Sequence, residues 1–272
     1  MNTQISNSQI EFYQKNGFLV VDNLLDDEEL DTWRAALATA IEQHIAKNAE
    51  RGSSTFHNQN RDSYYKDVFV QCVNLWKTND RMKELVLDRR LGMLASDLAG
   101  VGGVRLYHDH ALVKQPWANP TNWHVDNPGD PFYTRDAVML WITLDDATLQ
   151  NGCLYFMPGT HRSSRFGRRS GSLNEAKIDG LFAAYPEWSG IEPVAAEASA
   201  GAGVFINGMI AHAAGPNMTI HPRRVMALLF MPEGSVYNGH SSALPEELTS
   251  RLSKGDLLAD DEHLPLVFSR SS

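Results

Sequence analysis

The feature that most constrains the fold is a change in sequence pattern at Gly100. Within residues 26–47, before this glycine, the apolar residues fall three and four positions apart: Leu30, Trp33, Leu37, Ile41 and Ile45. This spacing forms one apolar stripe along a helix. After Gly100 the chain breaks into short strand-like runs, for example 137–146 and 223–230, which Gly, Pro, Asn and Asp residues separate. Helices first and many strands later predict a β-sandwich or barrel that helices flank.

Two local signals predict where elements begin and end. Ser8, with Glu11 three residues later, predicts the capping box of a first helix, and Gly17 predicts the end of that helix. The dipeptide Asn151-Gly152 lies between two strand-like runs and predicts a β-hairpin. Both signals are local, so each can be checked against the geometry of a few residues.

The domain organisation is expected to be simple, because no repeat, low-complexity tract or linker divides the chain. We expect one domain over 1–272, in which residues 1–100 are mainly helical support. Residues 101–240 are expected to form the barrel, and 241–272 a C-terminal helix and tail. The polar, irregular stretch 162–200 is expected to be an insertion or lid.

Charge and composition exclude several classes of partner. The formal net charge of −9 argues against a nucleic-acid partner, and the longest apolar runs, such as 225–231, are too short to cross a bilayer. The polar N-terminus shows no secretory signal, and Cys72 and Cys153 are too few for a disulfide framework. We therefore expect a cytoplasmic protein with reduced thiols and no membrane partner. The sequence leaves monomer and homodimer open.

The triplet His124-Val125-Asp126 is the first candidate metal site. Such a triplet arises easily by chance in a chain with ten histidines, so it needs partners elsewhere. On a strand, side chains two residues apart point to the same face, which would place His124 beside Asp126. His212 lies between an apolar segment and a turn, and it is the best candidate for a third ligand. Two histidines and one carboxylate leave three positions open on Fe(II), enough for a bidentate co-substrate and oxygen.

Arg223 begins a strand-like run eleven residues after His212. If these two segments are adjacent antiparallel strands, a guanidinium would lie near the metal and could bind a carboxylate in bidentate fashion. Its neighbour Arg224 should point to the opposite face.

Two alternatives to this site remain open. His108 and His110 form a His-x-His pair, which would serve a cupin-type metal enzyme that works without such a co-substrate. However, the residues that follow this pair supply no well-spaced Glu. The non-enzymatic alternative is a β-barrel binding protein without iron.

Three segments together resemble the phytanoyl-CoA dioxygenase family: WHVD at 123–126, NGCLYFMPGTH at 151–161 and HAAGPNMTIHPRR at 212–224. The likeness extends over most of the chain. The spacing from histidine to arginine and the order of the segments are more specific than the His-x-Asp triplet alone. The family consists of Fe(II)- and 2-oxoglutarate-dependent oxygenases. The resemblance therefore implies a double-stranded β-helix, a jelly-roll or cupin-like barrel, with an N-terminal helical layer.

The resemblance also implies roles for individual residues. It assigns iron binding to three positions: His124, Asp126 and His212. It assigns contacts with 2-oxoglutarate to four others: Arg223, Trp141, His110 and Asn74. Many members carry Ser or Thr two residues after the distal histidine, where the hydroxyl assists the arginine, but this chain has Ala214.

The reaction that the resemblance implies consumes O2 and decarboxylates 2-oxoglutarate to succinate while a small-molecule substrate is oxidised. Hydroxylation of an unactivated C–H bond is the expected outcome. Asp126 occupies the position where related halogenating enzymes have a small residue and bind halide, so oxygenation is expected rather than halogenation. No basic cleft for the phosphates of coenzyme A is visible, which favours a free small metabolite as substrate.

Overall fold

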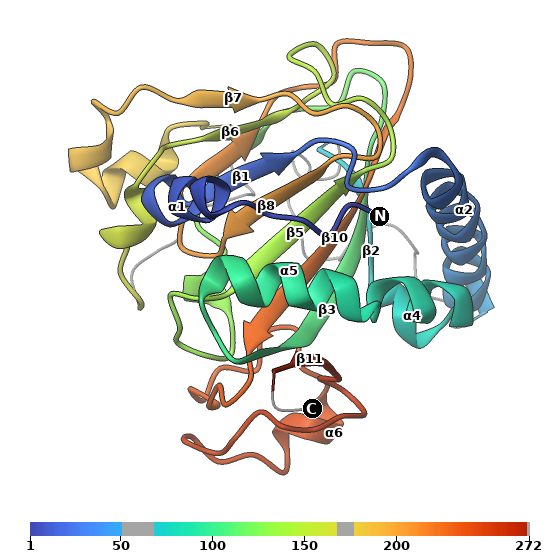
Figure 1. Ribbon diagram of the computed structural model, residues 1–272. Helices are drawn as coiled ribbons and strands as arrows, with labels where there is room; N and C mark the ends of the chain where they lie inside the picture. Colours follow the sequence, from blue (N-terminus) through green and yellow to red (C-terminus); the bar gives the residue numbers. More distant parts are fainter. Residues whose placement is uncertain (51–67, 168–176, 271–272) are drawn as a thin grey trace.

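The computed structural model describes residues 1–50, 68–167 and 177–270. Their strands form two antiparallel sheets that face each other, with helices on the outer side of the larger sheet (Figure 1). The predicted fold class is confirmed: the protein is mainly β, with a double-stranded β-helix and an N-terminal helical layer.

The major sheet has seven strands in the described residues, in the order β1-β8-β5-β10-β3-β11, with β2 also paired to β3. Its strands are β1 (Phe18–Val21), β2 (Val70–Val73), β3 (Gly103–Lys114), β5 (Val138–Thr143), β8 (Gly203–Asn207), β10 (Arg223–Pro232) and β11 (Leu266–Ser269). The two ends of the chain therefore contribute strands to the same sheet as the central segments.

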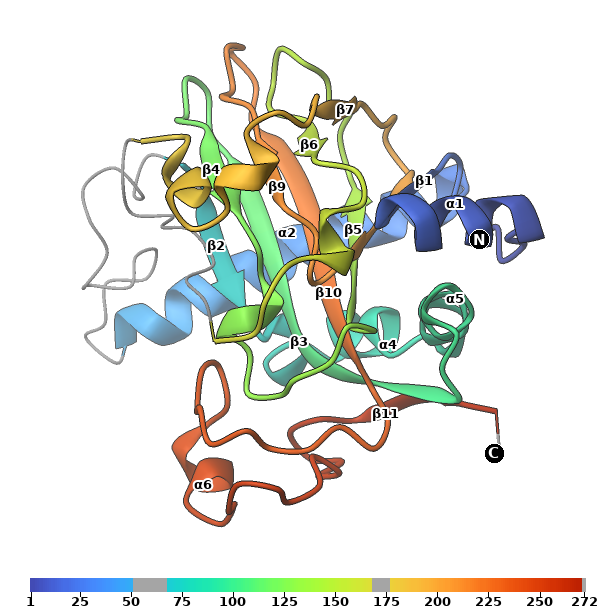
Figure 2. The ribbon, with the colours of Figure 1, turned by 90° about the vertical axis from the view of Figure 1, so that its left-hand side faces the viewer.

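The minor sheet faces the major one and has the order β4-β9-β6-β7 (Figure 2). Its strands are β4 (Thr121–His124), β6 (Leu154–Phe156), β7 (Val194–Ala196) and β9 (His212–Ala214). All of these strands are short, so the positions of individual side chains depend strongly on how each strand is paired.

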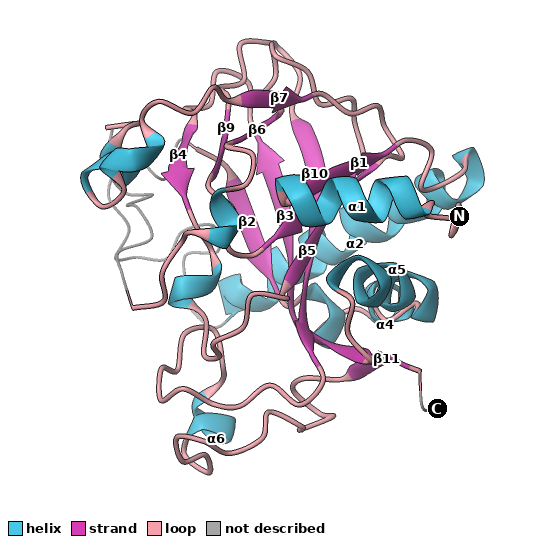
Figure 3. Ribbon diagram, turned by 60° about the vertical axis from the view of Figure 1, so that its left-hand side comes forward, coloured by secondary structure: helices cyan, strands magenta, loops and turns pink. Residues whose placement is uncertain are grey.

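Helices cover the outer face of the major sheet (Figure 3). They are α1 (Asn7–Asn16), α2 (Asp27–Glu50), α4 (Asp80–Val86) and α5 (Arg89–Ala99), while the short α6 (Glu246–Thr249) belongs to the C-terminal segment. No helix in the described part of the chain combines the length and the apolar character needed to cross a membrane.

The strands of the major sheet are apolar on both faces because each face contacts a different core. In β5, Leu140 and Ile142 pack toward the helices, whereas Met139 and Trp141 point between the two sheets. The two-residue period of a strand produces this alternation. A sheet that is covered on both sides accounts for the continuous apolar runs in the sequence.

A third apolar cluster covers the outer face of the minor sheet. Leu181, Tyr185 and Trp188 pack there against Trp123 and Ala213. Leu181, Tyr185 and Trp188 belong to the stretch 162–200 that is expected to be an insertion or lid, of which 168–176 lie outside the described residues. The described part of the stretch buries the back of β4 and β9.

Two local predictions are wrong in detail. The capping box of α1 is formed by Ser6 and Gln9, because Ser6 has the extended backbone that an N-cap requires; Gly17 ends the helix in the left-handed conformation, as predicted. The Asn151-Gly152 turn joins β5 to β6, but these strands lie in different sheets. The turn is therefore a corner between the sheets and not a β-hairpin.

Candidate active site

The three predicted metal ligands come from the ends of two neighbouring strands in the minor sheet. His124 is the last residue of β4, and His212 is the first residue of β9 and its antiparallel partner in register. Asp126 does not continue the strand, because its backbone turns (φ −76°, ψ −56°) to begin a short 3-10 helix, Asn127–Gly129. The expectation that His124 and Asp126 share one face of a strand is therefore wrong, although the turn brings their side chains together.

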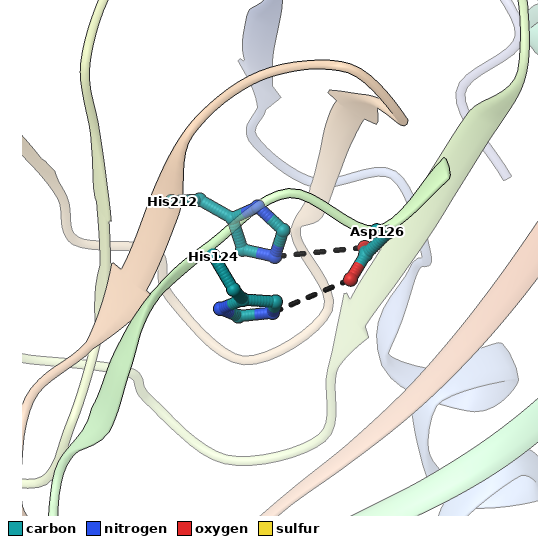
Figure 4. A group of neighbouring side chains, drawn as sticks. All are labelled: His124, Asp126 and His212. Carbon is teal, nitrogen blue, oxygen red and sulfur yellow. Dashed lines mark ion pairs between the residues drawn. The ribbon is translucent and has the colours of Figure 1, made fainter. Parts of the chain in front are cut away.

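The ligand atoms converge on one point (Figure 4). Nε2 of His124 lies 3.3 Å from Oδ1 of Asp126, and Nε2 of His212 lies 3.6 Å from Oδ2. All three groups offer a ligand atom within 4.8 Å of the other two. These separations suit three atoms that each lie about 2.1 Å from a common ion. Two imidazoles and one carboxylate on one side of an ion make the facial set that non-haem Fe(II) oxygenases use.

Backbone carbonyls fix both imidazole rings in the orientation that a metal needs. Nδ1 of His124 lies 2.8 Å from the carbonyl of Asn122, and Nδ1 of His212 lies 3.1 Å from the carbonyl of Ile210. A ring that donates its Nδ1–H to a carbonyl keeps the lone pair of Nε2 available for an ion. The residues present therefore fit a ferrous centre.

The electrostatics of the three ligands also suit a cation. Burial raises the pKa of Asp126, but the charges of His212 and His124 outweigh burial and hold this pKa well below its usual range. Burial and the charge of His124 lower the pKa of His212 to about 4. Burial also lowers the pKa of His124, but the hydrogen bond and charge of Asp126 raise it overall. Near neutral pH the centre therefore offers an anionic carboxylate and at least one neutral imidazole.

A pocket opens between the two sheets in front of this centre. It is lined by Phe69, Gln71, His110, Leu112, Thr121, His124, Asp126, Met139, Trp141, Leu154, Ile206, His212, Ala213, Ala214 and Arg223. The structure thus brings six of the seven predicted site residues into one cavity. Asn74, the seventh, does not line it.

Asn74 instead shapes the turn that follows β2. Its backbone is left-handed (φ 58°) and leads into the 3-10 helix Leu75–Lys77, and its N–H donates to the carbonyl of Asp109. Gln71, which the sequence analysis did not identify, lines the pocket, and its Nε2 lies 2.9 Å from Nδ1 of His110. A polar residue inside the apolar run 68–73 was the only signal for Gln71.

Arg223 is a buried cation that has no acidic partner among the described residues. It is 2% exposed, and burial lowers its pKa to about 10. Its guanidinium lies 4.7 Å from the centre of the Trp141 ring, and Nη1 donates to the carbonyl of Gly152 at 2.6 Å. Nε is buried without a hydrogen-bond partner. Since a buried, unpaired charge is costly, this side chain is suited to an anionic ligand. Arg224 points away from the pocket and pairs with Asp145.

Lys114 lies behind Arg223 and is fully buried. The two residues are antiparallel partners in β3 and β10, and Nζ of Lys114 donates to the carbonyl of Asn119 at 2.6 Å. Burial, and then the charge of Arg223, lower the pKa of Lys114 to about 6. The amine is therefore largely neutral at physiological pH.

Lys114→Met is expected to change how stability depends on pH. Below about pH 6 the wild-type amine is charged in both the folded and the unfolded chain, so the full cost of its burial is present. As the pH rises toward 10.5, the usual pKa of a lysine, the folded chain is neutral at this amine while the unfolded chain stays protonated, so folding releases a proton. Wild-type stability should therefore rise, relative to the variant, by at most about 1.4 kcal/mol per pH unit. Urea unfolding of both proteins at about pH 6 and about pH 9 measures this difference in stability. A difference that does not change with pH would contradict the lowered pKa of the buried Lys114 amine.

The competing pair, His108 and His110, has no third ligand among the described residues. Their ring centroids are 5.1 Å apart, and burial lowers the pKa of His108 to about 3. Within residues 1–50, 68–167 and 177–270, the groups that could hold an ion are the triad and the set Glu247, Glu262 and His263. This geometry argues against a cupin-type site at His108.

The chain is similar to several known proteins, of which three are described here. A methylphosphonate hydroxylase from Gimesia maris is 25% identical over 231 residues, which cover 85% of this chain and 82% of that protein. The crystal structure of the non-heme alpha ketoglutarate dependent carbocyclase SnoK from nogalamycin biosynthesis matches with a TM-score of 0.77 and 25% identity, over 97% of both chains. The epimerase SnoN, in complex with Fe3+, alpha ketoglutarate and nogalamycin RO, matches with a TM-score of 0.73 and 23% identity over 96% of this chain and 98% of its own, and shares the fold.

The family model for phytanoyl-CoA dioxygenase (PhyH) matches residues 13–225. This range includes both sheets from β1 to the start of β10, the three candidate metal ligands and Arg223. The match covers far more than half of the chain, and the chain belongs to the phytanoyl-CoA dioxygenase family.

Proposed function

We propose that this chain is an Fe(II)- and 2-oxoglutarate-dependent oxygenase that hydroxylates an unactivated C–H bond of a small-molecule metabolite and releases succinate. One observation carries the proposal. A facial set of two imidazoles and one carboxylate lies in the same pocket as a buried arginine without an acidic partner in the described residues. The first feature suits Fe(II) with open coordination positions, and the second suits the distal carboxylate of a dicarboxylate.

Five residues of the pocket have a proposed task. His124, Asp126 and His212 would hold the iron, and Arg223 would bind the far carboxylate of 2-oxoglutarate. Trp141 holds the guanidinium of Arg223 in place by stacking. When bound, iron and 2-oxoglutarate supply the oxidising chemistry, with O2 as the oxidant.

The rest of the chain positions these groups and excludes water. Apolar residues from both sheets line the pocket: Leu112, Met139, Leu154 and Ile206. An apolar wall strengthens the ionic contacts within it, because little solvent screens them. The pairing of β1, β2 and β11 within the major sheet supports one domain over the whole chain.

The same lining supports a free small metabolite as the substrate. Among the described residues that line the pocket, Arg223 is the only Lys or Arg, and the proposed function assigns it to 2-oxoglutarate. A coenzyme A thioester would bring several phosphate charges, for which the described lining offers no further cation. A cytoplasmic location is supported by the two cysteines, which are both free and buried.

Succinate release tests the proposal. We expect purified protein supplied with Fe(II) and 2-oxoglutarate to form succinate only when O2 is present, with a mass increase of one oxygen in a substrate drawn from a metabolite panel. His108→Ala should retain this activity and His124→Ala should lose it. The opposite pattern would indicate the cupin-type alternative, and no release from any protein would indicate a binding protein without iron chemistry.

A further inference from the structure

Three polar side chains near Asp126 have buried atoms without a hydrogen-bond partner in the described residues. These atoms are Oδ1 and Nδ2 of Asn127, Oδ2 of Asp130 and Nδ1 of His108. Asn127 is fully buried, and Asp130 is 8% exposed. A buried polar atom without a partner costs free energy, so a ligand that supplies the missing hydrogen bonds would be bound favourably at this place.

The turn that follows β4 brings Asn127 and Asp130 together. The N–H of Gly129 donates to the carbonyl of Asp126, and the N–H of Asp130 donates to the carbonyl of Asn127, each at 3.0 Å. In a 3-10 turn of this kind, residues three positions apart lie on the same side. The backbone that turns Asp126 toward the two imidazoles therefore also places a second carboxylate, that of Asp130, beside the amide of Asn127.

His108 approaches the same place from the major sheet. It lies two residues before His110, which lines the pocket, and side chains two apart on a strand share a face. Burial and the neighbouring His110 lower the pKa of His108, whereas the charge of Asp126 raises it. Burial, and then the same charge of Asp126, raise the pKa of Asp130 well above its usual range. Since the charge of Asp126 acts on both groups, both lie close to the candidate metal centre.

These groups lie far from the end of the pocket that contains Arg223. Arg223 is the antiparallel partner of Lys114, and His108 lies six residues before Lys114 on β3. Six residues of a strand span about 20 Å, and 2-oxoglutarate is much shorter than this. Neither Asn127 nor Asp130 lines the cavity that contains Arg223. A co-substrate held by Arg223 would therefore leave these groups available to the substrate.

Asp130 decides which chemical group would bind there. Within the described residues its carboxylate forms no ion pair and no hydrogen bond. An unpaired buried acid favours a ligand group of opposite charge. An ammonium group supplies that charge, and its N–H bonds can be accepted by Oδ2 of Asp130 and Oδ1 of Asn127.

We propose that Asp130, together with Asn127 and His108, binds the ammonium group of an amine-bearing substrate beside the metal centre. The inference rests on the proposed function and names its substrate class, a small metabolite with a basic amine. Arg223 and Asp130 would then separate the two small molecules by charge. The buried cation suits the dicarboxylate, and the buried acid suits the amine.

Proton relaxation caused by Mn(II) tests this subsite without turnover. The probes are cyclohexylamine, cyclohexanol and cyclohexanecarboxylate, which share one apolar ring and differ in their head groups. With protein loaded with Mn(II) and 2-oxoglutarate, the ring protons of cyclohexylamine should relax faster, because Mn(II) relaxes only nearby protons. Cyclohexylamine should bind at least about 10-fold more tightly than the other two probes, since an ammonium–carboxylate contact is a charge-assisted hydrogen bond.

Asp130→Asn keeps the shape of the side chain and removes its charge. The variant should bind cyclohexylamine about 10-fold more weakly than wild type, at the level of cyclohexanol. Its affinity for 2-oxoglutarate, measured by calorimetry, should stay within about 2-fold of wild type, because Asp130 lies outside the cavity that contains Arg223. Asp136→Asn is the matched control, since it changes an exposed carboxylate and should keep the wild-type preference for cyclohexylamine.

The outcomes separate this subsite from the proposed function. If wild type binds Mn(II) and 2-oxoglutarate but shows no preference for cyclohexylamine, or binds it without faster relaxation, the ammonium subsite is overturned and the proposed function stands. A preference that Asp130→Asn keeps, or that Asp136→Asn loses to the same extent, also overturns the subsite. If wild type itself binds neither Mn(II) nor 2-oxoglutarate, the proposed function is overturned, and this inference with it.

Discussion

Asp126→Ala is expected to reduce succinate formation by more than about 100-fold, which exceeds the usual loss when a residue that only supports a metal ligand is changed. Asp126 is the only anionic member of the triad, and its two oxygens lie 3.3 Å and 3.6 Å from the two imidazole nitrogens. Without it, the two histidines would have to hold the cation alone. Mn(II) affinity, followed by electron paramagnetic resonance, should fall together with succinate formation.

Asp136→Ala is the matched control, because Asp136 is an exposed carboxylate outside the pocket lining. It should leave both metal affinity and succinate formation within about 2-fold of wild type, as surface changes usually do. An Asp126→Ala protein that keeps wild-type Mn(II) affinity would contradict the metal centre. A loss of succinate in both variants would point to a general effect of the substitutions.

Arg223→Met is expected to weaken binding of 2-oxoglutarate by about 30-fold or more, since loss of one partner of a buried charge pair costs about 2–5 kcal/mol. The same variant should be at least as stable as wild type when no co-substrate is bound. The guanidinium is buried without an acidic partner in the described residues, so an apolar side chain of similar length removes a desolvation cost. Thermal unfolding and calorimetric titration on the Mn(II)-loaded protein measure the two effects.

Arg224→Met should show the opposite pattern and is the control for this prediction. Arg224 pairs with Asp145 on the outer side of the sheet and is 39% exposed, so its loss is expected to cost at most about 1 kcal/mol of stability. Its 2-oxoglutarate affinity should not change. If Arg223→Met lowers stability strongly and leaves 2-oxoglutarate affinity intact, Arg223 is a structural residue and not a co-substrate ligand.

The two sheets contribute different groups to the candidate site. The minor sheet carries His124 and His212 at the ends of β4 and β9, and Asp126 lies in the turn that follows β4. The major sheet carries Arg223 and Trp141. Each sheet is held in place from behind: the helices pack on the major sheet, and Trp188 with its neighbours packs on the minor one. Ligand geometry is therefore set by two independently supported surfaces that face each other.

Several parts of this arrangement could be predicted because their signals are local. The stripe of apolar residues in α2 and the short runs after Gly100 reflect the periods of a helix and a strand, which operate over a few residues. The histidine and carboxylate of WHVD are separated by one residue, so they meet in a strand and also in the turn that the chain adopts. Arg223 and Arg224 point to opposite sides because adjacent residues of a strand always do.

Other parts of this arrangement depend on tertiary contacts between residues that lie far apart in the sequence. The position of His212 opposite His124 and the corner at Asn151-Gly152 both depend on which strands pair and in which sheet. Gln71 lines the pocket and Asn74 does not, because β2 pairs with β3 in one register and then turns away. The sequence by itself determined the fold class and the chemical types of the candidate ligands. Only the pairing of distant strands, which packing across the whole domain selects, decided which side chains share the cavity.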